Sequence, residues 1–489
     1  MAAKEFIVAI ELGSSKITGI AGKKNLDGSI SVLAVVKEDA TQCIRKGVVY
    51  NIDKTAQCLT NIISKLKSQL KSEIAHVYVG VGGQSIRSVR NVSIKDDFAG
   101  ETIITADMIN ELMDQNRNMA YPDQEILDAA TQEYKVDNQF QLDPVGIKAM
   151  RLEGNFLNII CRKTFYNNIN TCFDKAGIAI AEFFLAPIAL AESVLTESER
   201  RGGCVLVDLG ADTTTVSVYY KNVLRHLAVI PLGGNNITRD IASLQMEDAD
   251  AEKMKLRYAS AYTDNSDIDN TLNYPIDEER SVESRKFIDI VEARLNEIIE
   301  NVWNQVPSEY VEKLLGGIIL TGGGCNMKNL ERAFRLQTHV DKIRIAKFVN
   351  QTITSSNADV NAHNGMMNTV LGLLAKGDIN CAGNAINLTR NMFGEEQGAP
   401  QTAPTTAELH PEARAASEIG GKGIVQTAAE KEKAEEERRR QQEEIDRQKQ
   451  AEEEAEKKRI AAEKRENSFW NKAMKGIKKF GKSIVEEED

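Results

Sequence analysis

Two short segments of the chain combine an acidic residue with a turn of small residues, an arrangement that can hold a phosphate group. In one of them, the apolar residues 205–207 end at Asp208, the turn Leu209–Asp212 follows, and a β-branched pattern resumes at Thr213. Small residues let backbone N–H groups approach an anion closely, and a carboxylate can hold a hydrated divalent cation that neutralises the same anion. Taken alone, this segment predicts only a β-hairpin, because most glycine turns between strands are simply turns.

A second segment near the N-terminus repeats the pattern. The apolar residues 6–10 lead to Glu11, then to the small-residue turn 13–16, and then to a second apolar run at 17–21. Two such hairpins about two hundred residues apart indicate two similar half-domains whose turns converge on one ligand. Together they predict a phosphate clamp.

The segments around these hairpins alternate between strand and helix patterns, which is typical of a layered α/β fold. A helical period covers 53–70, and a buried strand follows at 76–81. From 84 to 164 the pattern changes to short alternating strands with an acidic helix at 106–117, and afterwards the α/β alternation returns. We therefore expect a small subdomain inserted into an α/β body.

A glycine pair and a charged pair follow the Asp208 hairpin. Gly233 and Gly234 precede a predicted helix at 237–244. Glu252 and Lys255 are three residues apart on the next predicted helix and so share one of its faces. From the sequence alone this pair is either part of a binding site or an ordinary solvated surface pair.

A third glycine-rich turn ends the apolar segment 316–321. Gly322, Gly323 and Gly324 leave a bare backbone against which a flat ring could lie, although such a loop can equally be plain packing. Amphipathic patterns at 287–306 and 361–374 predict the remaining helices.

Composition limits the class of protein. The 489 residues exceed a single core, and 42% hydrophobic residues suffice for two or more domains. The formal charge of −11 argues against a nucleic-acid partner. The seven cysteines are scattered without a Cys-x-x-Cys spacing, which favours a reducing cytosol over a disulfide framework or a zinc site. No apolar run approaches the ~20 residues of a membrane span, so we expect any membrane attachment to be peripheral.

The amino-acid composition of the C-terminal hundred or so residues changes twice. Residues 391–429 are rich in Pro, Gly, Ala and Thr and predict a disordered linker. Residues 430–467 alternate acidic and basic side chains, with acid-first pairs four apart that support a charged helical tether, while the apolar seam of a coiled coil is missing.

Residues 468–485 predict an amphipathic helix at a membrane surface, with apolar residues recurring at three and four and lysines on the remaining face. The alternative is that this stripe docks on the protein's own core or in a calmodulin-like groove. The candidate lipid-binding residues are Phe469, Trp470, Met474, Lys475, Ile477, Lys478, Phe480, Lys482 and Ile484.

Several short motifs of this chain, taken in their order along the sequence, resemble those of the bacterial cell-division FtsA family. That family lies within the actin, sugar-kinase and heat-shock ATPase superfamily. The resemblance covers about residues 4 to 380. It is carried by AIELGSSKITGI at 9–20, QEY at 132–134, DPVG at 143–146, LAESVLTESER at 190–200, DAEKMKLRYA at 250–259 and ILTGGGCNM at 319–327.

The resemblance implies an actin-like α/β fold of two lobes with ATP between them and an FtsA-type subdomain inserted in the first. The expected boundaries are 1–83 and 165–200 for the first lobe (1A), 84–164 for the insertion (1C), 201–235 and 305–390 for the second lobe (2A), and 236–304 for its smaller subdomain (2B). The linker, the tether and the amphipathic helix follow.

The resemblance also assigns candidate site residues. Gly13, Ser14, Ser15, Lys16, Gly210, Ala211, Asp212 and Thr213 would surround the phosphates of ATP, with Asp208 orienting a hydrated Mg²⁺. Gly233, Gly234, Glu252, Lys255, Gly322, Gly323 and Gly324 would lie on the ribose and adenine side.

One departure from the family concerns turnover. Many relatives carry glycines where Ala211 and Asp212 stand, and a carboxylate there should repel a γ-phosphoryl group unless a cation intervenes. We therefore expect ATP binding with at most slow hydrolysis, and Asp208 is the only catalytic candidate, as the residue that positions magnesium-bound water.

The implied function is that of a structural adaptor at the division septum. Such a protein polymerises, tethers the FtsZ ring to the cytoplasmic face of the inner membrane as a peripheral protein, and binds the FtsZ C-terminal peptide, anionic lipid and other division proteins. Two alternatives remain open: a pilus-assembly-type ATP-binding protein, and an ATP-dependent phosphotransferase of the same superfamily.

Overall fold

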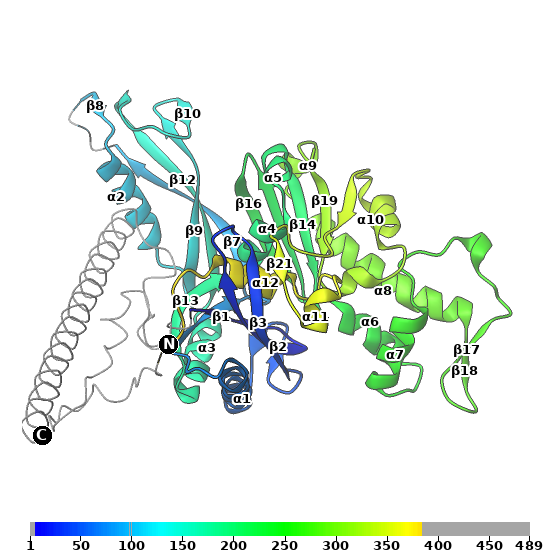
Figure 1. The fold of residues 1–489 in the computed structure, drawn as a ribbon. Coiled ribbons are helices and arrows are strands. Elements are labelled where there is room, and N and C mark those ends of the chain that lie inside the picture. The colour runs from blue at the N-terminus through cyan, green and yellow to red at the C-terminus, as the bar shows by residue number, and fades with distance from the viewer. Residues whose placement is uncertain (1–4, 97, 99, 384–489) are drawn as a thin grey trace, which may run out of the picture. The chain divides into compact units, whose positions relative to one another are not determined.

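The computed structural model of the chain describes residues 5–96, 98 and 100–383, and Figure 1 shows its elements coloured along the sequence. Both predicted hairpins and all the candidate nucleotide residues fall within this part. The predicted linker, charged tether and amphipathic end lie beyond residue 383, outside the described residues.

A six-stranded sheet forms the first lobe. Its strands are β1 (Ile7–Leu12), β2 (Lys16–Lys24), β3 (Ile30–Asp39), β6 (His76–Val81), β13 (Ala179–Leu185) and β21 (Ile353–Thr354), in the order β13-β6-β1-β2-β3-β21. β1 and β2 form the antiparallel hairpin predicted around Glu11, whereas β6 pairs in parallel with β1 and β13. A small hairpin of β4 (Ile44–Arg45) and β5 (Val48–Val49) follows β3.

Helices pack on the strands of this sheet. They are α1 (Ile52–Leu70), α3 (Lys163–Ala176), α4 (Ala186–Val194) and α12 (Asn368–Lys376). α1 packs on β2, β3 and α3, whereas α12 packs on β1, β2, β6 and α4. α1 begins where the side chain of Asn51 accepts a hydrogen bond from the Lys54 amide, and its buried residues recur every three or four positions.

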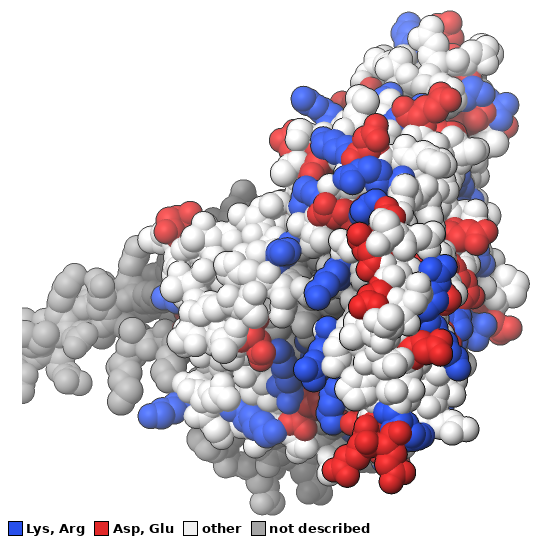
Figure 2. Space-filling view, turned by 90° about the vertical axis from the view of Figure 1, so that its right-hand side faces the viewer, with Lys and Arg blue, Asp and Glu red and all other residues white. Residues whose placement is uncertain are grey.

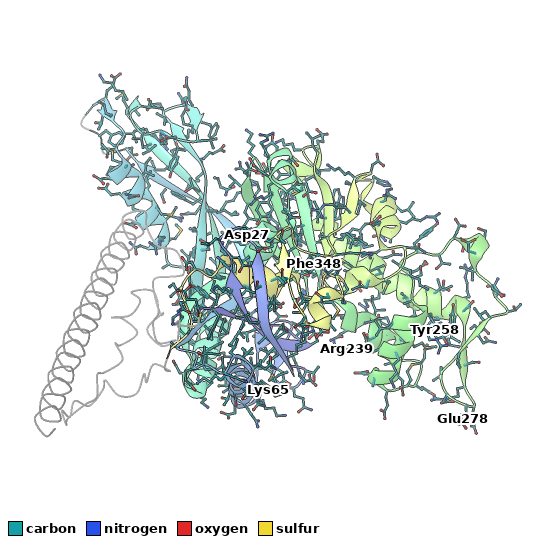
Figure 3. The ribbon with its side chains drawn as sticks, in the orientation of Figure 1. Asp27, Lys65, Arg239, Tyr258, Glu278 and Phe348 are labelled. Carbon is teal, nitrogen blue, oxygen red and sulfur yellow. The ribbon has the colours of Figure 1, made fainter. Side chains whose placement is uncertain are left out.

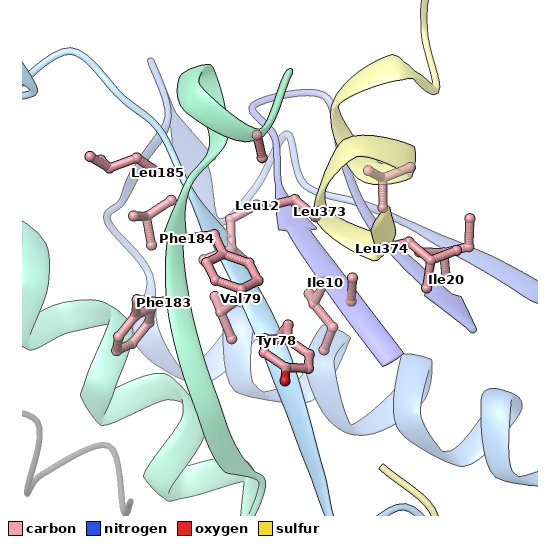
Figure 4. Close-up of a cluster of buried hydrophobic side chains, with 14 of the residues drawn as sticks. Ile10, Leu12, Ile20, Tyr78, Val79, Phe183, Phe184, Leu185, Leu373 and Leu374 are labelled. Carbon is pink, nitrogen blue, oxygen red and sulfur yellow. The ribbon is translucent and has the colours of Figure 1, made fainter. Parts of the chain in front are cut away.

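The core of the first lobe lies between α12 and the central strands, as Figure 4 shows. Ile10 on β1, Tyr78 on β6 and Leu373 on α12 are fully buried there. The rings of Tyr78 and Phe184 stack with their centroids 5.1 Å apart. This apolar layer fixes β1, and with it the turn that β1 leads into.

A nine-stranded sheet runs from the inserted segment into the second lobe. The inserted strands are β7 (Arg87–Lys95), β9 (Gln124–Val136), β10 (Gln139–Gln141) and β12 (Leu152–Arg162). Those of the second lobe are β14 (Cys204–Leu209), β15 (Thr214–Tyr220), β16 (Val223–Ile230), β19 (Gly317–Thr321) and β20 (Ile343–Ile345). The two groups join where Arg87 on β7 pairs with Ala228 on β16.

The inserted domain, here β7 to β12 with α2 (Ala106–Arg117), has a core of its own. α2 packs on β7 and β12, and a short pair of β8 (Thr102–Ile103) and β11 (Lys148–Ala149) lies beside them. Its fully buried residues include Leu112, Leu152 and Phe156. This separate core matches the change of pattern seen in the sequence.

Helices cover the second-lobe strands and form its smaller subdomain. They are α5 (Glu197–Gly202), α6 (Gly234–Ala242), α7 (Asp248–Tyr258), α8 (Ser284–Asn304), α9 (Ser308–Val311) and α10 (Leu330–Thr338), with the short β17 (Asn273–Pro275) and β18 (Ser281–Glu283) pairing near α8. Two 3₁₀ turns are η1 (Asn265–Asp267) and η2 (Gly323–Asn326). Figure 2 shows acidic and basic side chains interspersed on the face that it draws.

One predicted helix is wrong in its extent. The apolar pattern predicts a single helix at 361–374, but the structure has α11 (Ala358–Asn361), a break, and then α12 from Asn368. Gly365 lies in the break with φ +79°, a left-handed conformation that favours glycine, and its amide donates to the carbonyl of Lys347. A partner distant in sequence therefore interrupts the helix.

Candidate functional site

The two predicted phosphate turns have the same construction. In the turn between β1 and β2, the amide of Gly13 donates to the carbonyl of Lys16 at 3.1 Å. In the turn between β14 and β15, the amide of Gly210 donates to the carbonyl of Thr213 at 2.9 Å. Each turn places three residues between the strand before it and the carbonyl that closes it, so the repeat predicted from the sequence is present in the backbone.

Two acidic residues stand at corresponding positions beside these turns. Glu11 and Asp208 are each the second-to-last residue of their strand. Burial raises the pKa of Asp208 to about 6. Burial also raises the pKa of Glu11 to about 7, with Lys16 and Lys37 opposing the shift and the charge of Asp208 adding to it. The carboxyl groups of the two lobes therefore lie close enough to interact.

The triple-glycine turn packs against Asp208 and Leu209. Gly322 has φ +89°, and a Cβ there would lie 2.6 Å from the carbonyl oxygen of Leu209 and against the Asp208 carboxylate. A Cβ on Gly324 would lie 2.9 Å from the Cβ of Leu209. At Gly323 a Cβ would meet only Met366, at 3.6 Å, so the bare backbone there faces a less crowded space.

The glycine pair at the start of α6 packs against the second phosphate turn. The amide of Gly234 donates to the carbonyl of Gly210 at 3.0 Å, and that of Asn235 donates to Ala211 at 2.7 Å. A Cβ on Gly233 would lie 2.6 Å from the Ala211 carbonyl oxygen. Glycine is therefore required for the beginning of α6 to approach this turn so closely.

Lys255 and Glu252 connect α7 to the start of α6, and the lysine of this pair is buried although the Glu252 side chain is 40% exposed. The Lys255 side chain is only 10% exposed, and its Nζ lies 2.6 Å from a Glu252 carboxylate oxygen. Nζ also donates to the carbonyl of Gly234 at 3.0 Å and to the Thr238 hydroxyl at 2.8 Å. These contacts hold both side chains beside the first turn of α6.

A turn of the first lobe that was not predicted from the sequence contacts both phosphate turns. Lys46 and Gly47, between β4 and β5, donate backbone hydrogen bonds to Asp212 at 3.2 Å and to the Ser14 hydroxyl at 2.8 Å. Asn235 and Arg239 on α6, with Arg239 marked in Figure 3, also approach Asp212. The sequence feature that could have predicted this turn is Gly47 between the short apolar segments of IRKGVV at 44–49.

The structure thus assembles every candidate nucleotide residue around the ends of two hairpins, one in each lobe. Ser15 is exposed, whereas Ser14 and Lys16 are half-buried, and burial lowers the pKa of Lys16, with the nearby charge of Lys37 adding to the shift. Among residues 5–383 that the structure describes, no three His, Cys, Asp or Glu side chains gather as a metal group. No helix in this described part is long and apolar enough to cross a membrane.

Comparisons with known proteins agree on one family. Residues 205–372 match the family model described as "Cell division protein FtsA", and residues 83–160 match that of the "SHS2 domain inserted in FTSA". The cell division protein FtsA of Porphyromonas gingivalis is 33% identical over 332 residues, which cover 67% of this chain and 69% of that protein. The FtsA of Pseudomonas aeruginosa is 31% identical over 334 residues, covering 66% of this chain and 79% of that protein.

A solved structure supports the fold. A chain of the "PilM-PilN type IV pilus biogenesis complex" matches with a TM-score of 0.53 and 14% identity, covering 75% of this chain and 97% of that chain. At this identity the likeness concerns the fold alone. With the family matches, it confirms the predicted actin-like α/β fold with an FtsA-type insertion.

Proposed function

Because the chain belongs to the FtsA family of cell-division proteins, we propose that it is an ATP-binding adaptor of the division site. In this proposal the body binds ATP with Mg²⁺ between its lobes and assembles into polymers. The C-terminal helix attaches that body to the cytoplasmic face of the inner membrane, and the second lobe holds the FtsZ C-terminal peptide. Its role is mainly structural.

The observation that carries the nucleotide proposal is the pair of equivalent turns. Each turn is closed by the same backbone hydrogen bond, and each has a carboxyl group beside it, one in either lobe. The residues present fit the phosphates of a nucleotide, because a Cβ at Gly13 or Gly210 would lie 2.7 or 2.8 Å from the carbonyl oxygen that closes its own turn. Tight turns of small residues can expose backbone N–H groups to an anion.

Magnesium, when bound with the nucleotide, would neutralise phosphate charge. Asp208 supplies a carboxylate that can orient the ion's water shell, and Lys16 supplies a cation on the opposite turn. In this proposal, the ribose and adenine contact the bare turn at Gly323 and the Glu252–Lys255 pair. Isothermal titration with ATP and Mg²⁺ tests this proposal, and a failure to detect binding would contradict it.

The membrane proposal depends on residues 468–485, whose sequence alternates a lysine face with an apolar face. Attachment of such a helix combines burial of its aromatic side chains with ~1 kcal/mol per lysine near an anionic surface. We propose that the charged tether at 430–467 acts as a spacer between this helix and the body.

Sedimentation of the full chain with anionic liposomes tests the attachment. Trp470→Glu should abolish co-sedimentation, because it places a charge within the apolar face, while ATP binding stays unchanged. Asn471→Glu is the matched control, since it adds the same charge on the polar face and should retain most of the binding. Retained sedimentation of the Trp470 variant would refute the membrane assignment.

For the partner, we propose that the FtsZ C-terminal peptide binds the smaller subdomain of the second lobe, at about 236–304. Other division proteins and a second copy of this chain are further partners in this proposal. Adding the FtsZ peptide to the liposome assay tests it: labelled peptide should sediment with the wild type and remain in solution with the Trp470 variant.

A further inference from the structure

Asp212 stands in the second phosphate turn, and its carboxylate is held by groups from both lobes. Only 8% of the residue is exposed. Oδ2 accepts a hydrogen bond from the Lys46 amide at 3.2 Å, and Oδ1 accepts one from the Asn235 side chain at 2.8 Å. A guanidinium nitrogen of Arg239 lies 3.8 Å from Oδ1. The Asp212 carboxylate therefore accepts two hydrogen bonds, from Lys46 and Asn235, and lies near the positive charge of Arg239.

These contacts tie the two lobes together at the phosphate turns. Lys46 belongs to the first lobe, whereas Asn235 and Arg239 belong to α6 of the second. The next amide along the chain, that of Gly47, donates to the Ser14 hydroxyl of the first phosphate turn. Two successive amides thus hold one side chain from each turn.

The Lys46–Gly47 turn is itself fixed in position. Both residues have left-handed backbone conformations, with φ +52° and +71°. A Cβ on Gly47 would lie 2.6 Å from the Cα of Gly83, and the Lys46 carbonyl accepts from the amide of Gln84 at 3.0 Å. Because this turn has little room to move, the negative charge of Asp212 is held in one place.

We propose that Asp212 is a specificity-determining residue of the nucleotide site, which favours a nucleoside diphosphate over a triphosphate. The inference rests on the proposed nucleotide function. A terminal phosphate bound at this turn would add negative charge beside a fixed carboxylate, and like charges repel each other more strongly in a partly buried site than in water. A diphosphate adds less negative charge there, so it can bind while the Lys46–Asp212 hydrogen bond between the lobes is kept.

The test measures the dissociation constants of ATP and ADP, each with Mg²⁺, for the full chain and for two variants. Asp212→Asn removes the charge and keeps the shape of the side chain, whereas Asp212→Gly removes the whole side chain. Both should raise the affinity for ATP relative to ADP by roughly tenfold. Glu278→Gln, the same loss of charge at the exposed β17–β18 turn, should leave this ratio unchanged; Glu278 lies away from Arg239 in Figure 3.

The outcomes separate this inference from the proposed function. Nucleotide binding with an ATP-to-ADP ratio that Asp212→Asn leaves within about twofold of the wild type would overturn the role of Asp212 alone. An absence of binding in the wild type and in every variant would overturn the nucleotide function as well.

Hydrogen exchange without nucleotide gives a second, independent readout. Asp212→Gly should speed exchange of the Lys46 amide, because that amide loses its acceptor, while amides in the centre of α1 stay protected. Unchanged exchange at Lys46 would refute the tie between the lobes.

Discussion

Glu11 and Asp208 bring two carboxyl groups to the mouth of one site, and each has a pKa above its ordinary value. Burial is the main cause for both, and for Glu11 the charge of Asp208 contributes as well. Between about pH 4 and pH 7 the folded protein therefore binds more protons than the unfolded chain. Stability should fall as the pH rises through this range, since the folded state must then hold two close negative charges.

Glu11→Gln should stabilise the nucleotide-free protein at pH 8 and have little effect at pH 5, where the wild-type carboxyl is already protonated. The expected gain in the free energy of unfolding at pH 8 is on the order of 1 kcal/mol. Urea denaturation at the two pH values measures it, with the exposed Glu278→Gln as control. An equal effect at both pH values would show that charge is not the cause.

At the scale of elements, Glu199 stabilises both the start of α5 and its attachment to a strand. Thr196 and Glu199 form a capping box at the start of α5, in which each side chain binds the other's backbone amide. The same Glu199 carboxylate pairs with Arg344 on β20, at 2.6 and 2.8 Å. This one residue therefore begins a helix and fixes it to the edge strand of the second lobe.

Glu199→Gln should destabilise the protein at neutral pH. Burial by itself would raise the pKa of Glu199, but hydrogen bonds from Arg344 and Thr196 outweigh it and lower the pKa to about 2. The ionised carboxylate thus stabilises the fold above about pH 4.5, and this contribution disappears as the pH falls towards 2. We expect a loss of about 1–2 kcal/mol at pH 7, allowing for solvent screening at the partly exposed Arg344.

The matched control is Glu192→Gln, which breaks the more exposed pair of Glu192 with Lys376. That change should cost less than about 0.5 kcal/mol. Thermal unfolding at pH 7 and pH 3 measures both variants. Equal losses for the two variants at pH 7 would contradict the role given to Glu199.

At the scale of the whole described body, three hydrophobic cores divide the chain. The inserted domain has a small core, yet it is joined to the second lobe by the Arg87–Ala228 bridge and by an ion pair between Arg90 and Glu309. Its strands also continue the sheet that carries the second phosphate turn. The small core around Phe156 can therefore unfold separately, whereas Leu127 on β9 and Leu157 on β12 belong to the larger core of the first lobe.

Phe156→Ala should destabilise the inserted domain by about 3 kcal/mol, because the ring is 1% exposed and packs edge-on against Tyr134. Hydrogen exchange should rise around Tyr134 on β9 and Phe156 on β12 and stay low in β1 and β6, with nucleotide affinity unchanged. Phe140→Ala is the control, since that ring is 61% exposed in the same domain. Increased exchange throughout both lobes would show that the inserted core is not separate.

The two hairpins, most helices and the insertion could be predicted from the sequence, because each depends on neighbours in the chain. Strand, acidic residue and glycine turn follow one another within about a dozen residues at both Glu11 and Asp208. Periodicity likewise located α1 and α8, whose buried faces repeat every three or four residues. The sequence by itself also determined the family, through short motifs in a fixed order.

Contacts between residues far apart in the chain were decided only by the tertiary structure. Whether the Lys255 side chain is solvated or buried depended on how α7 packs on α6, and the break before α12 depended on the distant carbonyl of Lys347. Asp212 and Lys46 are 166 positions apart, so no local pattern could show that the predicted repulsive charge is bound by the opposite lobe. The physical reason is that local propensity fixes turns and helices, whereas the partners of a buried polar group are chosen by packing.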